Sequence, residues 1–173
     1  WFTAGWLHQL VDTDISLFKG LSTVLAGGDR LSPSHIGKLR DTYPSLEIIN
    51  GYGPTENTTF SLTYNISDVV GDIPIGYPIS NSTVYVLDAY QNLVPRGVLG
   101  EIYLGGDGLS RGYLNQPELT AAKFISDPFN EGKRLYKTGD LGHWNTDGGL
   151  SFAGRKDAQV KIRGYRIELS EIE

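Results

Sequence analysis

The chain has 173 residues, a formal net charge of -5, and neither cysteine nor methionine. Without cysteine it has no disulfide framework, no thiolate zinc site and no thiol nucleophile. Because open reading frames begin with methionine, we expect a processed product or, in preference, an internal fragment. Hydrophobic residues at 39% and charged residues at 20% indicate a folded, soluble chain.

Charge and hydropathy disfavour two further classes. The acidic balance and the lack of a long Lys/Arg block argue against a nucleic-acid binder. No apolar run approaches the ~18–20 residues of a membrane span, and no signal peptide is visible, so we expect no membrane partner and a cytoplasmic location. The histidines, His8, His35 and His143, are far apart in the sequence and match no metal spacing, so each is expected to be structural.

The first third of the chain predicts alternating helices and strands. Apolar residues recur at helical spacing over residues 6–18, and a short buried strand follows at 21–26. Ser32-Pro33 is typical of a helix start, and this second helix is expected to end near residue 42. A further buried strand is predicted at 46–49. This order indicates a parallel sheet with helices on its faces.

After about residue 57 short strands alternate with turns rich in Gly, Pro, Asn and Asp, which predicts an antiparallel barrel or sandwich. The predicted strands are 58–64, 83–88, 100–105, 135–138, 142–145 and 149–153. One helix is expected near 117–124. Residues 154–163 form a charged, strand-like stretch, and 168–173 are typical of the first turn of a helix.

The segment with the most chemistry is NGYGPTE at residues 50–56, directly after a buried strand. Ligands of α/β sheets collect at the carboxyl ends of strands, and the two glycines let a ligand approach the backbone. Tyr52 could stack on a flat ring, and Thr55 offers a hydroxyl. Glu56 could hold Mg²⁺ where a nucleotide supplies the remaining oxygens. The alternative is a Gly-Pro turn with solvated polar residues.

The segment GEIYLGGDGLSRGY at residues 100–113 is glycine-rich but does not match a nucleotide fingerprint. The G-x-G-x-x-G spacing fails at Arg111, and the Gly-Lys-Ser/Thr of a phosphate-binding P-loop is absent. We predict a strand, a tight glycine turn and a second strand, with a structural role.

Three later segments carry further polar groups. In YKTGDL at 136–141, Asp140 could accept both hydroxyls of a ribose, or it could close a β-turn. In GRKD at 154–157, Arg155 could contact phosphate or ribose oxygens and Asp157 could be a hinge, or the segment could be a charged surface turn. The basic residues of VKIRGYRIE at 160–168 could approach an anionic ligand or form a solvated face.

These five segments, in this order and spacing, resemble the core motifs of amino-acid adenylation domains of nonribosomal peptide synthetases. That family belongs to the adenylate-forming enzymes, with acyl-CoA ligases and luciferases, and the resemblance covers nearly the whole chain. It implies an α/β plus β-barrel fold, the C-terminal part of the family's large subdomain. Residues 1–156 would belong to that subdomain, α/β to about residue 57 and β-rich beyond. Residues 157–173 would form the hinge and the start of the small mobile subdomain.

The resemblance also implies an activity. The family joins an amino-acid carboxylate to the α-phosphate of ATP, releases pyrophosphate, and passes the acyl group to the phosphopantetheine thiol of a carrier domain. The implied cofactors are ATP, Mg²⁺ and the carrier's phosphopantetheine, and the implied partners are the peptidyl carrier and condensation domains of the same synthetase. The loop at 161–168 would swing in for thiol transfer.

Individual roles are implied by motif position. The implied nucleotide-binding residues are Asn50, Gly51, Tyr52, Thr55, Asp140, Phe152 and Arg155. Tyr52 would stack on adenine, Asn50 would bind the adenine amino group, and Asp140 would hold the ribose hydroxyls. Thr55 and Glu56 would be catalytic, with Glu56 also the metal ligand, and Asp157 would be the hinge.

The family's upstream phosphate loop, its amino-group-binding aspartate and its late catalytic lysine have no match in the chain. We therefore expect that the 173 residues alone do not catalyse adenylation. Measurable ATP–pyrophosphate exchange by them would contradict this.

The implied substrate pocket contains no charged group and no amide. Its positions are Trp1, Leu25, Gly27, Gly51, Thr59 and Phe60. Such a pocket should accept an aliphatic side chain and reject a charged one, which would be buried unpaired. The combination resembles valine-activating domains, with isoleucine or leucine as the next choices.

Three alternatives remain open at this stage. The chain could belong to an acyl- or aryl-CoA ligase, which exchange assays across substrate classes would separate. It could be a non-catalytic β-rich binding module, which would leave Glu56, Asp140 and Arg155 scattered over the surface. It could also be an inactive or truncated gene product.

Overall fold

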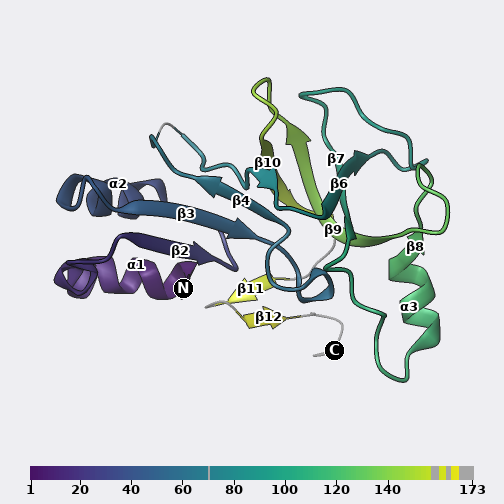
Figure 1. Cartoon of the computed structure of the whole chain (residues 1–173), viewed down its shortest axis with the longest axis horizontal. Helices are drawn as coiled ribbons and strands as arrows, with labels where there is room; N and C mark the ends of the chain where they lie inside the picture. Colours follow the sequence, from purple (N-terminus) through teal and green to yellow (C-terminus); the bar gives the residue numbers. More distant parts are fainter. Residues whose placement is uncertain (70, 157–159, 163–164, 168–173) are drawn as a thin grey trace.

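The main body of the molecule is built from two five-stranded sheets that meet near its centre, and a two-stranded sheet follows (Figure 1). The computed structural model describes residues 1–69 and 71–156, and the backbone of two short strands, β11 (Val160–Ile162) and β12 (Tyr165–Ile167). The predicted order, α/β first and antiparallel β-structure afterwards, is confirmed. The expected hinge at Asp157 and the helical turn at 168–173 lie outside the described residues, so the boundary after residue 156 stays a prediction.

The first sheet contains the two predicted parallel strands, adds a third parallel strand at residues 2–3 that was not predicted, and continues with two antiparallel strands. The predicted strand at 58–64 is wrong in its first half, because Thr58 and Thr59 have φ values of 46° and 60°. Those left-handed angles belong to a turn and not to a strand. In sheet order the strands are β1 (Phe2–Thr3), β2 (Thr23–Gly27), β3 (Glu47–Tyr52), β4 (Leu62–Asn65) and β5 (Tyr77–Pro78).

Two helices, α1 (Ala4–Thr13) and α2 (Pro33–Thr42), share one apolar core with β2 and β3. Each contributes fully buried residues to it, including Leu7 and Leu39. The first helix is shorter than the predicted 6–18. The helix ends at Thr13 because Asp14 leaves the helical conformation. The Asp14 carboxylate accepts a hydrogen bond from the Ser16 backbone N–H. A 3₁₀ turn, η1 (Ile15–Phe18), follows.

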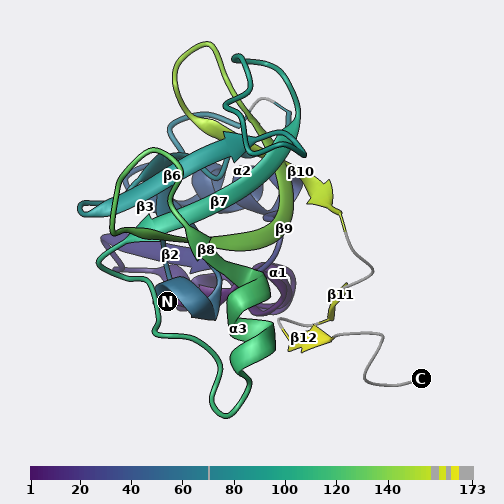
Figure 2. The same ribbon diagram turned by 90° about the vertical axis from the view of Figure 1, so that its right-hand side faces the viewer.

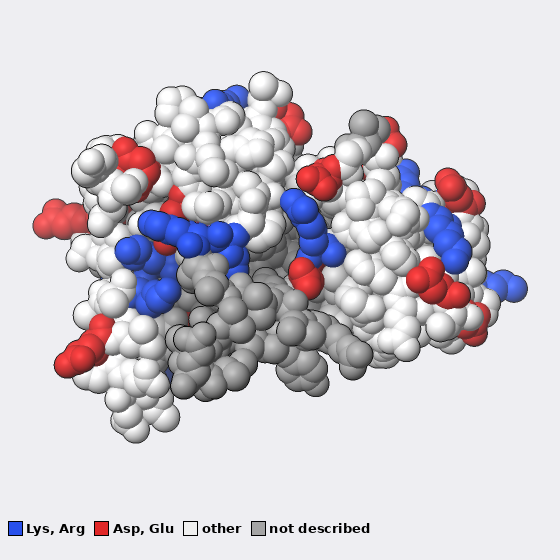
Figure 3. Space-filling view, turned by 180° about the vertical axis from the view of Figure 1, so that it is seen from behind, with Lys and Arg blue, Asp and Glu red and all other residues white. Residues whose placement is uncertain are grey.

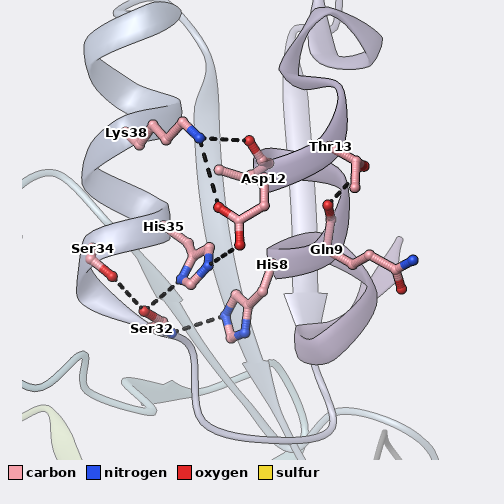
Figure 4. Close-up of polar contacts among 9 residues, drawn as sticks. His8, Gln9, Asp12, Thr13, Ser32, Ser34, His35 and Lys38 are labelled. Atoms are coloured by element: carbon pink, nitrogen blue, oxygen red, sulfur yellow. Dashed lines mark hydrogen bonds and ion pairs between the residues drawn. The ribbon is translucent and has the colours of Figure 1, made fainter.

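A polar network joins α1 to α2 (Figure 4). The rings of His8 and His35 stack with centroids 4.6 Å apart, so two histidines distant in the sequence are neighbours in the fold. His35 lies 3.1 Å from the Asp12 carboxylate and 2.7 Å from the Ser32 hydroxyl. That hydroxyl does not cap α2, although Pro33 opens the helix as predicted. The Ser32 backbone N–H donates to His8 Nε2 at 3.0 Å.

The second sheet is antiparallel, in the order β10-β9-β7-β6, with β8 paired to β9. A helix, α3 (Pro117–Lys123), leads into β8 (Figure 2). The second strand predicted within residues 100–113 is wrong, because residues 107–116 form an irregular loop. The strands are β6 (Ser82–Leu87), β7 (Gly100–Gly106), β8 (Phe124–Ser126), β9 (Arg134–Trp144) and β10 (Leu150–Arg155).

The longest strand, β9, contains a bulge where the sequence predicted a break between two strands. Residues 137–141 lie opposite only residues 101–103 of β7. Gly139 adopts φ 73°, an angle that favours glycine, and the Thr138 hydroxyl accepts a hydrogen bond from the Asp140 backbone N–H at 2.9 Å. The bulge thereby fixes the position of Asp140.

The two sheets are joined by a shared core and by backbone hydrogen bonds. The N–H groups of Ile75 and Gly76 both donate to the Leu150 carbonyl, at 2.9 and 3.1 Å. A Cβ on Gly76 would lie 2.1 Å from the Thr63 carbonyl oxygen of the neighbouring strand β4, so only glycine lets this segment pass so close to the edge of the first sheet. Both sheets contribute to the core beneath, which includes Tyr52, Leu62, Val86, Ile102 and Leu150.

On the face seen in Figure 3, a group of Lys and Arg side chains lies over the half of the molecule that carries the antiparallel sheet. Within the described residues, no helix has both the length and the apolar character needed to cross a membrane. The same residues contain no group of three or more His, Asp or Glu side chains arranged to hold a metal ion.

The histidine network makes folding stability depend on pH. Burial, followed by the neighbouring His35, lowers the pKa of His8 below its ordinary value of 6.5. The unfolded chain then binds the proton more readily, so this stability is present above about pH 6.5 and is lost as the pH falls through the lowered pKa. Protonation of His8 Nε2 removes the acceptor of the Ser32 backbone N–H. The free energy of unfolding should then fall by about 1 kcal/mol, the net value of one hydrogen bond.

We therefore expect the free energy of unfolding to fall between pH 7 and pH 5, as measured by urea denaturation of the domain that contains this chain. The His8→Leu variant should be less stable at pH 7 and show a flatter dependence. An equal pH dependence of the unfolding free energy in the wild type and in His8→Leu would mean that His8 is not the titrating group.

Candidate nucleotide and substrate site

A cavity of about 600 Å³ lies where the carboxyl ends of β2 and β3 face β9 and β10. Most of the predicted nucleotide-binding residues line it, although they come from both sheets. Thr55 does not line this cavity but contributes to its neighbour. The predicted residues at its wall are Asn50, Gly51, Tyr52, Asp140, Phe152 and Arg155.

Three of these side chains form one hydrogen-bonded group centred on Asp140. The Tyr52 hydroxyl donates to one carboxylate oxygen at 2.5 Å, and Arg155 donates to the other at 2.7 Å. Asp140 is 4% exposed, so its charge is buried and paired. Burial, followed by the charge of Asp140, raises the pKa of Tyr52 well above its usual range, which keeps the phenol a donor.

Both oxygens of Asp140 therefore have protein partners already. A carboxylate offers about four acceptor positions, so ribose hydroxyls could still bind beside Tyr52 and Arg155. The Tyr52 ring is 8% exposed and lies with its centroid 6.5 Å from that of Phe152. The two rings form an apolar part of the cavity wall.

Asn50 is buried beside this group. Its side-chain nitrogen donates to the Pro74 carbonyl at 2.8 Å, which fixes the orientation of the amide. The amide oxygen is the atom that could accept a hydrogen bond from a ligand. This arrangement suits recognition of an amino group such as that of adenine.

A second cavity, of about 440 Å³, contains three of the predicted substrate-pocket residues, Trp1, Thr59 and Phe60. The other residues at its wall are Gly28, Gly53, Thr55 and Thr58. Leu25, Gly27 and Gly51 do not line it, but the two glycines lie behind the Phe60 ring. A Cβ on Gly51 would be 2.5 Å from that ring, and one on Gly27 would be 3.4 Å from it.

The two cavities adjoin, because Gly28 and Gly53 line both. Gly53 must be glycine, since a Cβ there would lie 2.7 Å from the Ser61 nitrogen and from the Thr59 carbonyl oxygen. Thr55 stands at the wall of the second cavity next to this junction. A ligand in the first cavity and one in the second could therefore meet there.

Glu56 lines neither of these two cavities. It lies in a 3₁₀ turn, η2 (Thr55–Asn57), and is 6% exposed. Its carboxylate accepts a hydrogen bond from the Tyr113 hydroxyl at 2.6 Å. Burial, followed by this hydrogen bond, raises the pKa of Tyr113 far above its usual range, so that phenol also stays a donor. Asp140 and Arg155 thus converge on one cavity, and Glu56 is not part of its wall.

Sequence reasoning missed several residues of the site. His143, expected to be structural, lines the first cavity, and its side-chain direction depends on the bulge in β9. Asp29 and Arg30 also line it; their place just after β2 was a signal, because strand ends collect ligands. For Tyr113 no local signal existed, since its contact with Glu56 spans the two sheets.

A family model described as "AMP-binding enzyme" matches residues 3–114, and the chain therefore belongs to that family. It is 53% identical over its whole length to gramicidin S synthase 2 of Brevibacillus brevis. It is 51% identical over its whole length to surfactin synthase subunit 2 of Bacillus subtilis. The chain spans 4% and 5% of those two proteins.

Comparison with solved structures supports the same family assignment. The fold matches an NRPS protein containing adenylation and PCP domains bound to a vinylsulfonamide inhibitor, with a TM-score of 0.95 and 39% identity. It also matches an artificially fused adenylation–PCP di-domain NRPS from Klebsiella oxytoca, with a TM-score of 0.90 and 28% identity. Each match covers 99% of this chain, and 31% and 33% of the other chains. The predicted resemblance to adenylation domains of nonribosomal peptide synthetases is confirmed.

The Asp140 group yields a test of its geometry. Asp140→Asn removes the charge that Arg155 pairs with, and breaking a buried ion pair costs roughly 3–5 kcal/mol. Tyr52→Phe removes one hydrogen bond to a charged group and should cost only about 2 kcal/mol. Urea denaturation of both variants in the intact adenylation domain gives the two values. Equal losses would mean that Arg155 contributes little to holding the carboxylate.

Proposed function

We propose that this chain forms the nucleotide and amino-acid sites of a domain that activates an aliphatic amino acid with ATP. The observation that carries the proposal is the pair of adjoining cavities, one lined by Asp140, Arg155 and Tyr52 and the other by aromatic and threonine side chains. The junction at Gly28 and Gly53 is where the α-phosphate of ATP and the substrate carboxylate would meet. Family membership and the synthetase relatives support this reading.

In the proposed reaction, a carboxylate oxygen attacks the α-phosphorus of ATP. The bond to the bridging oxygen breaks, and pyrophosphate leaves with the electron pair. A carboxylate is a poor nucleophile, so holding it beside the α-phosphate supplies much of the rate. Asn50, Tyr52 and Phe152 would hold the adenine, Asp140 and Arg155 the ribose, and Thr55 would contact the α-phosphate.

The residues present are compatible with Mg²⁺. Glu56 offers a buried, hydrogen-bonded carboxylate, and one hard oxygen ligand suffices where phosphates supply the others. Bound Mg²⁺ would neutralise negative charge on the phosphates. The aminoacyl group would then pass to the phosphopantetheine thiol of a carrier domain, a partner supported by the adenylation–PCP proteins with the same fold.

The proposed substrate is valine, followed by isoleucine or leucine. Trp1 and Phe60 give the second cavity aromatic walls, with ring centroids 6.1 Å apart. Among the described residues at this wall none is charged, so a charged side chain would be buried without a partner. One methylene changes binding by only ~1–3 kcal/mol, so neighbouring aliphatic amino acids should also react.

Radiolabelled ATP–pyrophosphate exchange by the intact adenylation domain tests this proposal. We expect exchange with valine, weaker exchange with isoleucine and leucine, and none with aspartate or lysine. Aryl and fatty acids, assayed with coenzyme A, test the acyl- or aryl-CoA ligase alternative. Strong preference for a polar amino acid would overturn the substrate assignment, and preference for an aryl or fatty acid would overturn the class.

Gly51→Ala tests the substrate cavity separately. The added Cβ would lie 2.5 Å from the Phe60 ring and should push it into the cavity. The displaced ring would occupy space that the substrate side chain needs, and space for one methylene is worth ~1–3 kcal/mol, so we expect the KM for valine to rise by roughly tenfold. Gly37→Ala in α2 is the matched control, because its Cβ would meet nothing within 4 Å. Equal KM values for the two variants would mean that Phe60 does not line the substrate pocket.

A further inference from the structure

The irregular loop at 107–116 lies against the turn that carries Glu56. The Ser110 backbone N–H donates to the Glu56 carbonyl at 2.9 Å, and the Thr58 hydroxyl donates to the Gly108 carbonyl at 2.7 Å. Arg134 of β9 donates to the carbonyls of Ser110 and Arg111, both at 3.1 Å. The antiparallel sheet thus holds this loop against a turn of the first sheet.

Tyr113, near the end of the loop, is fixed by several contacts. Its backbone N–H donates to the Thr120 hydroxyl of α3 at 2.9 Å. Its ring packs edge-on against Phe124, with centroids 5.6 Å apart, and its hydroxyl lies 3.3 Å from that of Tyr136. Gly112 permits this approach, because its φ is 143° and a Cβ there would lie 2.4 Å from the Thr120 side chain.

The fixed hydroxyl donates to Glu56 Oε1 at 2.6 Å, a short distance typical of a charge-assisted hydrogen bond. We propose that Tyr113 is a positioning residue, which holds the Glu56 carboxylate in the orientation that binds the divalent cation of the nucleotide. The inference rests on the proposed function, because that function gives Glu56 its cation. Partners that hydrogen-bond a metal-binding carboxylate orient it, and their loss weakens metal affinity.

The test uses the intact adenylation domain and Mn²⁺, whose binding in the presence of a non-hydrolysable ATP analogue can be followed by electron paramagnetic resonance. Tyr113→Phe keeps the ring contact with Phe124 and removes only the hydroxyl. We expect Mn²⁺ to bind roughly tenfold more weakly. Tyr85→Phe is the matched control, because the Tyr85 hydroxyl is also hydrogen-bonded, to Asn130 at 2.9 Å, and lies outside the proposed site.

A Glu56→Gln background separates positioning from a general structural effect. If Tyr113 acts through the carboxylate, Tyr113→Phe should cause no further loss of Mn²⁺ affinity once Glu56→Gln is present. An equal loss in both backgrounds would overturn the inference, and so would wild-type Mn²⁺ affinity in Tyr113→Phe alone. Thermal denaturation of each variant verifies that it is folded.

The Mn²⁺ titration requires no amino acid, so it is independent of the exchange assay. Exchange by the wild-type domain with unchanged Mn²⁺ binding in Tyr113→Phe would reject the inference and leave the proposed function standing. Weaker Mn²⁺ binding in Tyr113→Phe would support the inference even if no amino acid stimulated pyrophosphate exchange by the wild-type domain. That second result would reject the proposed function.

Discussion

The buried carboxylate of Asp140 is the constraint on which the rest of the site depends. Asp140 is only 4% exposed, and a buried charge is tolerated only when it is paired and hydrogen-bonded. Tyr52 comes from β3 of the first sheet and Arg155 from the second sheet, so satisfying one carboxylate fixes both sheets around the cavity. The packing of the two sheets and the shape of the cavity wall thus depend on the same three side chains.

Close backbone packing is the second constraint, and glycine provides it. A Cβ on Gly27 would lie 2.0 Å from the Gly51 carbonyl oxygen, and one on Gly51 would overlap the Phe60 ring. The neighbouring strands β2 and β3 therefore leave room for the Phe60 ring where the side chains of larger residues would stand. The position of the Phe60 ring at the wall of the second cavity thus depends on the missing side chains of these two glycines, although neither glycine lines that cavity.

The sequence predicted the elements whose signals are local. Apolar spacing and Ser32-Pro33 located α2, and glycine and proline turns located most strands of the second sheet. Features set by long-range pairing were missed. The bulge in β9 appeared as a break because Gly139 interrupts the apolar pattern, although the chain continues opposite β7. The motifs placed Asp140 and Arg155 at a site, but pairing across 88 residues between Tyr52 and Asp140 has no local signature.

The surroundings of Glu56 come from both halves of the chain. The turn that carries it belongs to the first sheet, yet the hydrogen bond to its carboxylate comes from the loop that leaves β7. The same loop returns through α3 to β8, whose Phe124 packs against both Tyr113 and Tyr136. The antiparallel sheet therefore contacts the NGYGPTE segment at two separate points, Asp140 at Tyr52 and Tyr113 at Glu56. A glycine-rich segment that matches no phosphate-binding motif thereby orients a carboxylate of the NGYGPTE segment from the other sheet.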